Sequence, residues 1–386
     1  MKFAHVADLH LGKAVSHYSM LEEQRHILHE IFMICVHKRV DAILLAGDIY
    51  DRPVPSEEAV CLLNDFLKEL QEAKIEIFLI AGNHDSGERL SFAAEFLDTM
   101  HIHITGTYEG SLACTDMSDA YGILHVWSLP FIRPLDVRRY CMAKEAEEIH
   151  SYTDAVHYVL THAPIDFSER NILVTHQFVA GGNIDADSSE ELTVGGVDHI
   201  DPSVFAGFDY VALGHLHRAQ SVKEAWIRYS GAPLKYALGE VLHTKSLTLF
   251  SIAEKGEYRI STIPLKPRRD MVSLRGTFQE LMQSEMVDAH KDQYVAITLT
   301  NEEDVPDALS ILRTEYPFLM QMEYDNERTR HDHVQAQLSA IEERSPLELF
   351  ADFYALRNEK PMSEAQKDYM QNLIKEVWKE NKDETA

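Results

Sequence analysis

Residues 42–51 constrain the fold of this chain more strongly than any other stretch. They begin with an apolar run, Ala42 to Leu45, which predicts a short buried strand that ends in the turn Ala46-Gly47-Asp48. A carboxylate at the carboxyl end of such a strand lies where open α/β sheets bind ligands. We therefore interpret Asp48 as a residue that bridges two metal ions, although Asp after Gly is also common in ordinary turns.

Strands and helices alternate around this stretch. Apolar, strand-like runs occupy residues 2–7, 42–45 and 75–80, and helical periodicity covers about residues 20–38 and 56–73. Alternation of this kind predicts an α/β fold with a parallel or mixed sheet and right-handed crossovers.

Polar side chains of metal-ligand type follow five predicted strands: Asp8 and His10, Asp48, Asn83 and His84, His176, and His215 and His217. Residues two apart in an extended chain face the same side, so the first and last pairs are predicted to chelate. Each pair alone also fits a polar turn, and 21 histidines make chance pairs frequent. The carboxyl ends of neighbouring strands converge, however, and the whole set predicts a dinuclear site that suits a borderline divalent metal.

Two histidines that follow Thr compete for one ligand position. We prefer His176, because it ends a β-branched strand, whereas His162 ends a helix predicted over about residues 140–160. Asn83 offers an oxygen without adding negative charge. His84 cannot easily bind the same ion from the adjacent position, so we expect it to act as an acid or to stabilise charge.

Charge and composition limit the class of protein. The chain has 386 residues, enough for two or three domains, and a net charge of −27, which by itself argues against a nucleic-acid partner. Divalent metals would reverse the sign locally in an active site. No apolar run is long enough to span a membrane, no signal peptide is recognisable, and the four cysteines match no zinc or redox spacing, so we expect a cytoplasmic protein.

The ordered motifs DLH, GDIYD, GNHD, THQF and GHLH resemble the calcineurin-like metallophosphoesterase superfamily. Longer stretches, at residues 174–179, 194–198, 207–218 and 229–236, resemble its Mre11-like branch, the bacterial SbcD nuclease subunits, and the likeness covers nearly the whole chain. Asp85 and Pro53, where protein phosphatases of the superfamily have Glu and Gly, point away from that branch. The resemblance implies a β-sandwich flanked by helices, with a small α+β cap domain and C-terminal helices.

The resemblance also implies roles for the strand-end residues. One metal ion would be held by Asp8, His10, Asp48 and His217, and the second by Asp48, Asn83, His176 and His215. The family prefers manganese, and two such ions activate a water for attack on a phosphodiester. His84 would protonate the leaving oxygen or stabilise the transition state. Asp51 occupies a position where relatives have His or Asp, and orienting His84 from a second shell is one possibility.

The predicted domains follow the same resemblance: 1–266 as the nuclease domain, 267–330 as a cap that contacts DNA, 331–344 as a linker and 345–386 as C-terminal helices. Residues 294–324 read as strand, helix and strand. The terminal helices carry apolar faces. They either dock on their own domain or, as the resemblance implies, bind the coiled coil of an SbcC-like SMC-type ATPase. The polar loop 181–196, with Asp185 and Asp187, is expected to cover the site or to contact substrate.

The implied function is that of a manganese-dependent DNA nuclease subunit in an SbcCD-type complex, with a homodimer as the expected assembly. Its implied activities are a 3′-to-5′ double-strand exonuclease and a single-strand and hairpin endonuclease, used in DNA end processing, repair, recombination and replication. Two alternatives remain open: a phosphodiesterase or phosphatase acting on small molecules or phosphoproteins, and a tethering subunit without catalysis. The complete set of ligand-type residues argues against the second.

Overall fold

The computed structural model describes residues 1–182 and 199–329, together with scattered positions between 347 and 374. The chain divides into two compact units. The first comprises Met1–Leu274, Met282–Ile297 and Leu309–Met322, and the second Arg275–Leu281, Thr298–Ala308 and the chain from Glu323 onward. Three segments named in the predictions lie wholly or mostly outside the described residues: the loop 181–196, of which 181 and 182 are described, the linker 331–344 and the terminal segment 345–386.

The first six-stranded sheet contains the stretch around Asp48. Its order is β14-β13-β1-β4-β5-β6, with bounds β14 Tyr258–Pro264, β13 Ser246–Ile252, β1 Lys2–Val6, β4 Ala42–Ala46, β5 Glu76–Ile80 and β6 Ile102–Thr105. Strands β1, β4, β5 and β6 run parallel, whereas β13 and β14 pair antiparallel. The predicted mixed sheet is confirmed.

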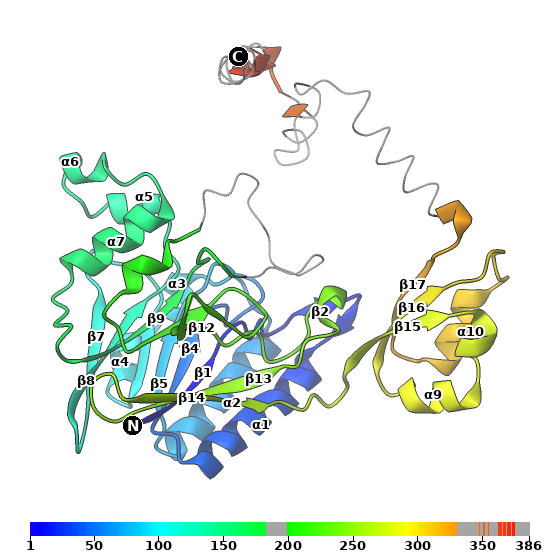
Figure 1. The fold of residues 1–386 in the computed structure, drawn as a ribbon, viewed down its shortest axis with the longest axis horizontal. Helices are drawn as coiled ribbons and strands as arrows, with labels where there is room; N and C mark the ends of the chain where they lie inside the picture. Colours follow the sequence, from blue (N-terminus) through cyan, green and yellow to red (C-terminus); the bar gives the residue numbers. More distant parts are fainter. Residues whose placement is uncertain are drawn as a thin grey trace. The chain divides into compact units, whose positions relative to one another are not determined.

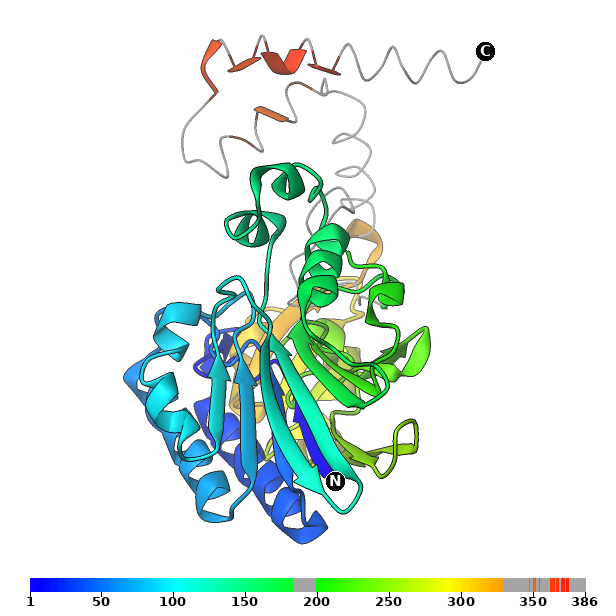
Figure 2. The same ribbon diagram turned by 90° about the vertical axis from the view of Figure 1, so that its left-hand side faces the viewer.

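Two long helices cover the outer face of this sheet (Figures 1 and 2), α1 (Leu21–Lys38) and α2 (Glu57–Glu72). Their apolar stripes pack on the side chains of β4 and β5 that point outward from the sandwich. Helix α2 begins where the sequence predicts, because the Ser56 hydroxyl accepts a hydrogen bond from the backbone N–H of Ala59 (3.3 Å). Helices α3 (Gly87–Leu90) and α4 (Ala94–Asp98) connect β5 to β6.

The second six-stranded sheet has the order β11-β12-β10-β9-β8-β7. Its bounds are β11 Gln220–Val222, β12 Glu224–Tyr229, β10 Tyr210–Gly214, β9 Arg170–His176, β8 Gly122–Leu129 and β7 Ala113–Asp119. Helix α7 (Tyr152–His162) packs on its outer face. The single helix predicted over 140–160 is wrong: α5 (Pro134–Arg138) and α6 (Ala143–Ala146) are separate, and a capping box between Ser151 and Asp154 starts α7 anew.

Apolar side chains from both sheets meet in one buried layer. Phe3, Leu44 and Phe78 of the first sheet pack with Ile172 and Tyr210 of the second. Helices therefore lie outside two stacked sheets, as Figure 2 shows, and the predicted α/β sandwich is confirmed. The carboxyl ends of β1, β4, β5, β9 and β10 supply the segments that form the site described below.

The buried side chain of His5 joins the two sheets. Its Nδ1 accepts a hydrogen bond from the Tyr210 hydroxyl (2.8 Å), and its Nε2–H donates to the carbonyl oxygen of Leu213 (3.2 Å). Burial, assisted by the charge of Arg228, lowers the pKa of His5 to about 3. The folded protein therefore holds this ring neutral at pH values where an exposed histidine is protonated.

Acid is expected to destabilise the chain through His5. Below about pH 6.5 the unfolded chain binds a proton that the folded chain takes up only near pH 3, so stability present above pH 6.5 is lost as the pH falls. Between pH 7.5 and 5.5 the loss from this one group is about 1.4 kcal/mol. Urea unfolding gives the free energy of unfolding at each pH. Its decrease from pH 7.5 to pH 5.5 should be smaller by this amount in His5→Gln than in the wild type. Equal differences in the two proteins would contradict the assignment.

The remaining elements are short. A three-stranded sheet has the order β15-β16-β17, with bounds Met271–Gly276, Tyr294–Leu299 and Leu319–Tyr324. It is accompanied by α8 (Phe278–Leu281), α9 (Ser284–His290) and α10 (Ala308–Glu315). Strand, helix and strand within 294–324 are confirmed as β16, α10 and β17, whereas β15, α8 and α9 were not predicted. The short elements elsewhere are β2 (Ala14–Val15), β3 (Tyr18–Ser19), η1 (Pro202–Phe205) and η2 (Leu238–Glu240). Among the described residues, no helix is long and apolar enough to cross a membrane.

Candidate metal centre

All the residues predicted to bind metal lie together where the two sheets meet. They follow or end β1, β4 and β5 of the first sheet and β9 and β10 of the second. His176, the histidine preferred from the sequence, is fully buried within this group. His162, the rejected alternative, is exposed at the end of α7, where its ring contacts the carbonyl oxygen of Tyr158 (2.8 Å).

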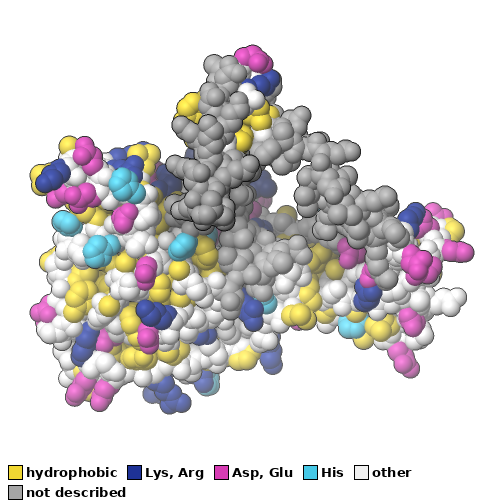
Figure 3. Space-filling view, turned by 45° about the horizontal axis from the view of Figure 1, so that its top comes forward, with side chains coloured by type: hydrophobic (Ala, Val, Ile, Leu, Met, Phe, Trp, Pro, Cys, Tyr) yellow, Lys and Arg dark blue, Asp and Glu magenta, His cyan; other side chains and the backbone are white. Residues whose placement is uncertain are grey.

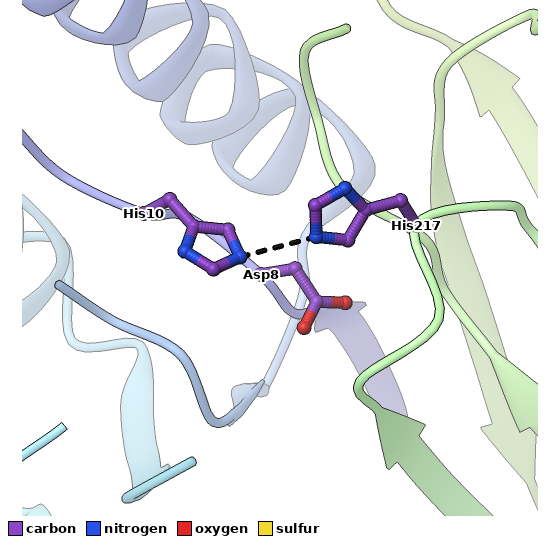
Figure 4. A group of neighbouring side chains, drawn as sticks. All are labelled: Asp8, His10 and His217. Atoms are coloured by element: carbon purple, nitrogen blue, oxygen red, sulfur yellow. Dashed lines mark hydrogen bonds between the residues drawn. The ribbon is translucent and has the colours of Figure 1, made fainter. Parts of the chain in front are cut away.

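One group of ligand-type side chains consists of Asp8, His10 and His217 (Figure 4). The Nε2 atoms of His10 and His217 face each other at 3.1 Å, with the Asp8 carboxylate beside them. All three side chains are buried, at 0–3% exposed. Two imidazole nitrogens and a carboxylate that converge in this way offer lone pairs to a single point.

A second group contains Asn83, His176 and His215. Asn83 Oδ1 lies 3.0 Å from His176 Nε2 and 3.1 Å from His215 Nδ1. The Asp48 carboxylate lies between the two groups, because its Oδ2 is 3.7 Å from His10 Nε2 and 3.5 Å from His176 Nε2. Asp48 is thus the residue that both groups share.

Left-handed backbone conformations bring these side chains together. The φ angles are 56° at Asp8, 43° at His10, 49° at Asp48 and 108° at His215. The extended conformation predicted for the pairs Asp8 and His10, and His215 and His217, is therefore wrong, although Asp8 and His10 still lie in one group. The chain turns sharply after each strand, and His215 and His217 face different groups. Non-glycine residues in these regions are strained, and such strain concentrates at functional sites.

Close backbone approach also requires glycine at two positions. A Cβ atom on Gly214 would overlap the carbonyl oxygen of Ala46, and one on Gly82 would overlap the Asp48 carboxylate. Both glycines directly precede ligand-type residues, since His215 follows Gly214 and Asn83 follows Gly82. The GNHD and GHLH motifs thus need glycine because no side chain fits where the backbone approaches its neighbours this closely.

Residues outside the predicted set hold these loops. The Asp85 carboxylate accepts hydrogen bonds from the backbone N–H groups of Ile49 (3.0 Å), Tyr50 (2.9 Å) and Gly82 (2.9 Å), and so ties the loop after β4 to the loop after β5. Glu240, in η2, lies behind His217. Sequence reasoning used Asp85 only to separate branches of the superfamily and missed Glu240, which becomes a neighbour of His217 only through the tertiary fold.

Hydrogen bonds fix the ring orientations of two site histidines. His176 Nδ1–H donates to the carbonyl oxygen of Ala46 (2.8 Å), and His217 Nδ1–H donates to the Glu240 carboxylate (2.9 Å). In both rings Nε2 is then the nitrogen that points into the site. A second polar group on the far ring nitrogen is the usual arrangement for a metal-binding histidine.

His84 lies at the edge of the first group. Its ring packs edge-on against His10 at 4.8 Å between centroids, and its Nδ1–H donates to the main-chain carbonyl of Asp51 (3.0 Å). The Asp51 carboxylate points elsewhere, to Lys13 Nζ (2.8 Å) and to within 3.7 Å of His10 Nδ1. Asp51 therefore contacts His84 through its backbone, while a role for its carboxylate in orienting His84 stays a prediction.

Burial and the neighbouring carboxylates act in opposite directions on the histidines of the site. Burial lowers the pKa values of His10 and His215, the latter to about 3, so these rings are neutral. Burial also opposes a charge on His176, but the carboxylates of Asp48 and Asp8 outweigh it and raise the pKa of His176 to about 9. Burial opposes the ionisation of Asp48 as well, yet His176 and His10 hold the pKa of Asp48 well below its ordinary value.

Two buried polar atoms test whether cations fit this site. Asp8 Oδ2 and His10 Nδ1 are both buried, and neither has a hydrogen-bond partner among the residues that the structure describes. Asp8 Oδ2 belongs to a group of ligand-type side chains, where a bound cation would satisfy such an acceptor. The donor set of carboxylate and amide oxygens with imidazole nitrogens suits borderline divalent ions. The site therefore fits divalent metal ions.

Comparisons with known proteins show which family the chain resembles. Residues 1–219 match the calcineurin-like phosphoesterase family, and residues 267–358 match the type 5 capsule protein repressor C-terminal domain. The SbcD subunit of the SbcCD nuclease of Staphylococcus epidermidis is 30% identical over 97% of this chain and 98% of its own length. The protein of the same name from Staphylococcus saprophyticus is 32% identical over 87% of this chain and 89% of its own. A solved dimetal phosphatase from Danio rerio is similar at a TM-score of 0.40 and 13% identity, over 69% of this chain and 96% of that one.

Proposed function

Since the chain belongs to the calcineurin-like phosphoesterase family and, within it, to the SbcD nuclease subunits, we propose that it is the manganese-dependent DNA nuclease subunit of an SbcCD-type complex. The observation that carries this proposal is the position of Asp48, whose Oδ2 lies within 3.7 Å of His10 and 3.5 Å of His176. A carboxylate placed between two groups of nitrogen and oxygen donors is what a two-metal phosphodiesterase needs.

The ligand assignment is part of the proposal. Asp8, His10, Asp48 and His217 hold one ion, and Asp48, Asn83, His176 and His215 hold the other. The two groups around Asp48 and the orphaned Asp8 Oδ2 support this division. When bound, such ions act as Lewis acids on the phosphate and lower the pKa of a water. Mixed nitrogen and oxygen donors favour manganese over magnesium, which prefers oxygen alone.

His84 is the proposed proton donor. Its Nδ1–H is occupied by the carbonyl oxygen of Asp51, so Nε2 is the atom that gives a proton to the leaving oxygen or stabilises its charge. The adjacent Asn83 lies in the second ligand group. The GNHD turn therefore supplies a proposed metal ligand, Asn83, and the proposed proton donor, His84, as adjacent residues.

DNA as the substrate has to be reconciled with a net charge of −27. On the face drawn in Figure 3, the Lys and Arg side chains of the described residues are interspersed with Asp and Glu side chains and form no continuous basic stripe. Binding is then concentrated at the metal centre, where the ions supply positive charge, and on the partner subunit. We propose 3′-to-5′ double-strand exonuclease and single-strand or hairpin endonuclease activities, which serve end processing in the cytoplasm.

The proposed domain roles follow from the family. Residues 1–266 form the nuclease domain, 267–330 the cap that contacts DNA, and 331–344 the linker. Residues 345–386 bind the SbcC-like ATPase, the partner implied by the name of the Staphylococcus relatives. A second copy of the chain completes the assembly, and Phe92, Phe96 and Met100, which are exposed at 82%, 69% and 40% in and beside the short helix α4, are candidates for that contact.

A cleavage assay tests the proposal. End-labelled linear duplex DNA and a hairpin are incubated with the purified chain, with and without its ATPase partner, in manganese or in magnesium. We expect shortening from the 3′ ends and hairpin opening in manganese, faster with the partner. Cyclic nucleotides and a phosphopeptide serve as competing substrates. Turnover of those compounds with intact DNA would instead establish a phosphodiesterase or phosphatase, and no turnover of any substrate would favour a tethering subunit.

A further inference from the structure

Two opposite charges are buried behind His217, on the side away from the metal site. The side chain of Glu240, the last residue of η2, is 0% exposed, and Lys245, just before β13, is 7% exposed. Burial is costly for a charged group and is tolerated only when the charge is paired and hydrogen-bonded. Replacing such a pair by apolar residues of similar size is often neutral or stabilising. A contribution to folding stability therefore does not by itself explain why a charged pair is buried here.

The contacts of the pair converge on His217. Glu240 Oε1 accepts from His217 Nδ1–H at 2.9 Å, while Glu240 Oε2 accepts from Lys245 Nζ at 2.6 Å. Lys245 Nζ also donates to the main-chain carbonyl of His217 at 2.9 Å. The ring and the backbone of His217 are thus held by the same two side chains.

The support of the other fixed histidine in the site is different. His176 Nδ1–H donates to a neutral carbonyl group, that of Ala46, whereas His217 Nδ1–H donates to a full carboxylate. A carboxylate on the far nitrogen increases the basicity of the nitrogen that binds the metal and fixes the ring orientation. Lys245 keeps that carboxylate in place and balances its charge.

We propose that Glu240 and Lys245 are a positioning pair that fixes the tautomer and orientation of His217, and thereby sets the affinity of the Asp8, His10 and His217 group for its divalent ion. This inference rests on the ligand assignment of the proposed function. It adds that the pair acts on one ion only. The rings of the second group are held by other partners, because His176 bonds to Ala46 and Asn83, and His215 bonds to Asn83.

Manganese titration of the full-length chain by calorimetry, without DNA or partner, tests the pair. Glu240→Gln keeps an acceptor for His217 Nδ1–H but removes the charge, and Lys245→Met removes the ammonium group at similar length. We expect both to weaken one of the two binding events by about 10- to 100-fold and to leave the other unchanged. Lys245→Arg should recover most of the lost affinity, because it restores a cation beside Glu240.

A matched control separates metal affinity from stability. Lys255 pairs with the buried carboxylate of Asp209 at 2.8 Å, so Lys255→Met also breaks an ion pair with a buried partner. It should lower the melting temperature without changing either manganese affinity. If Glu240→Gln and Lys245→Met behave like this control, the pair is structural and the inference is overturned. If the wild type binds two manganese ions but leaves DNA intact, the proposed nuclease function fails while the positioning role stands.

Discussion

Asp48→Asn is expected to lower the rate of manganese-dependent DNA cleavage by roughly 10³-fold or more. In the wild type the Asp48 Oδ2 atom lies 3.7 Å from His10 Nε2 and 3.5 Å from His176 Nε2. An amide carries no negative charge, and if its oxygen keeps the hydrogen bond from the His84 backbone N–H, its NH2 group takes the Oδ2 position and offers no lone pair to either group. Binding of both proposed ions should therefore weaken together, and calorimetry should show a loss of manganese affinity in both binding events.

The same substitution leaves the local fold intact. Asp48 has a φ angle of 49°, a conformation that asparagine adopts readily. The side-chain oxygen that accepts from the backbone N–H of His84 (2.9 Å) is available in the amide as well. Asp65→Asn is the matched control, because that carboxylate on α2 is 62% exposed, and it should cleave DNA like the wild type. Cleavage by Asp48→Asn at the wild-type rate would place the chemistry elsewhere.

Local patterns were sufficient to predict where the ligand-type residues lie. The apolar runs before Asp48 and Asn83 form β4 and β5, because uninterrupted apolar stretches of this length are buried on both faces of a sheet, here by helices on one face and by the second sheet on the other. The side chains that follow them converge because parallel strands end at the same edge. The preference for His176 over His162 relied on the same principle, and only His176 lies in the site.

The backbone geometry of the site could not be predicted in this way. The extended conformation assumed for Asp8 and His10 gives way to left-handed turns, which are held by backbone hydrogen bonds from Asp8 N–H to Gly47 O (3.0 Å) and from His10 N–H to Asp48 O (2.9 Å). These bonds join residues far apart in the chain, so no local pattern encodes them. The energetic cost of these strained turns is offset by the tertiary contacts around them.

Supporting residues were missed for a related reason. Glu240 is 23 residues from His217 in the sequence, and only the fold makes it the acceptor for that ring. In the sequence it is one of 63 acidic residues, with no spacing that marks it. A buried carboxylate is recognisable only when its burial and its partners are known. The ligand-type residues of a site are thus easier to predict from the sequence than the residues that hold them in place.

His84→Gln is expected to lower kcat by about 10²- to 10⁴-fold while leaving both manganese affinities unchanged. His84 Nδ1–H is bound to the carbonyl oxygen of Asp51 (3.0 Å), and glutamine can keep a donor at that position. What it cannot supply is the ring Nε2 that gives a proton to the leaving oxygen. This separation of kcat from metal affinity distinguishes His84 from Asp48, whose substitution removes both.

Single-turnover cleavage under saturating DNA and manganese gives the rate of the chemical step for His84→Gln. His162→Gln is the matched control, since this exposed histidine at the end of α7 lies outside the site and its loss should leave the rate unchanged. A wild-type rate in His84→Gln would show that another group protonates the leaving oxygen. Loss of manganese affinity in the same variant would instead make His84 a ligand, which its position beside His10 and Asp48 also permits. Measuring both quantities on one preparation therefore decides between proton transfer and coordination.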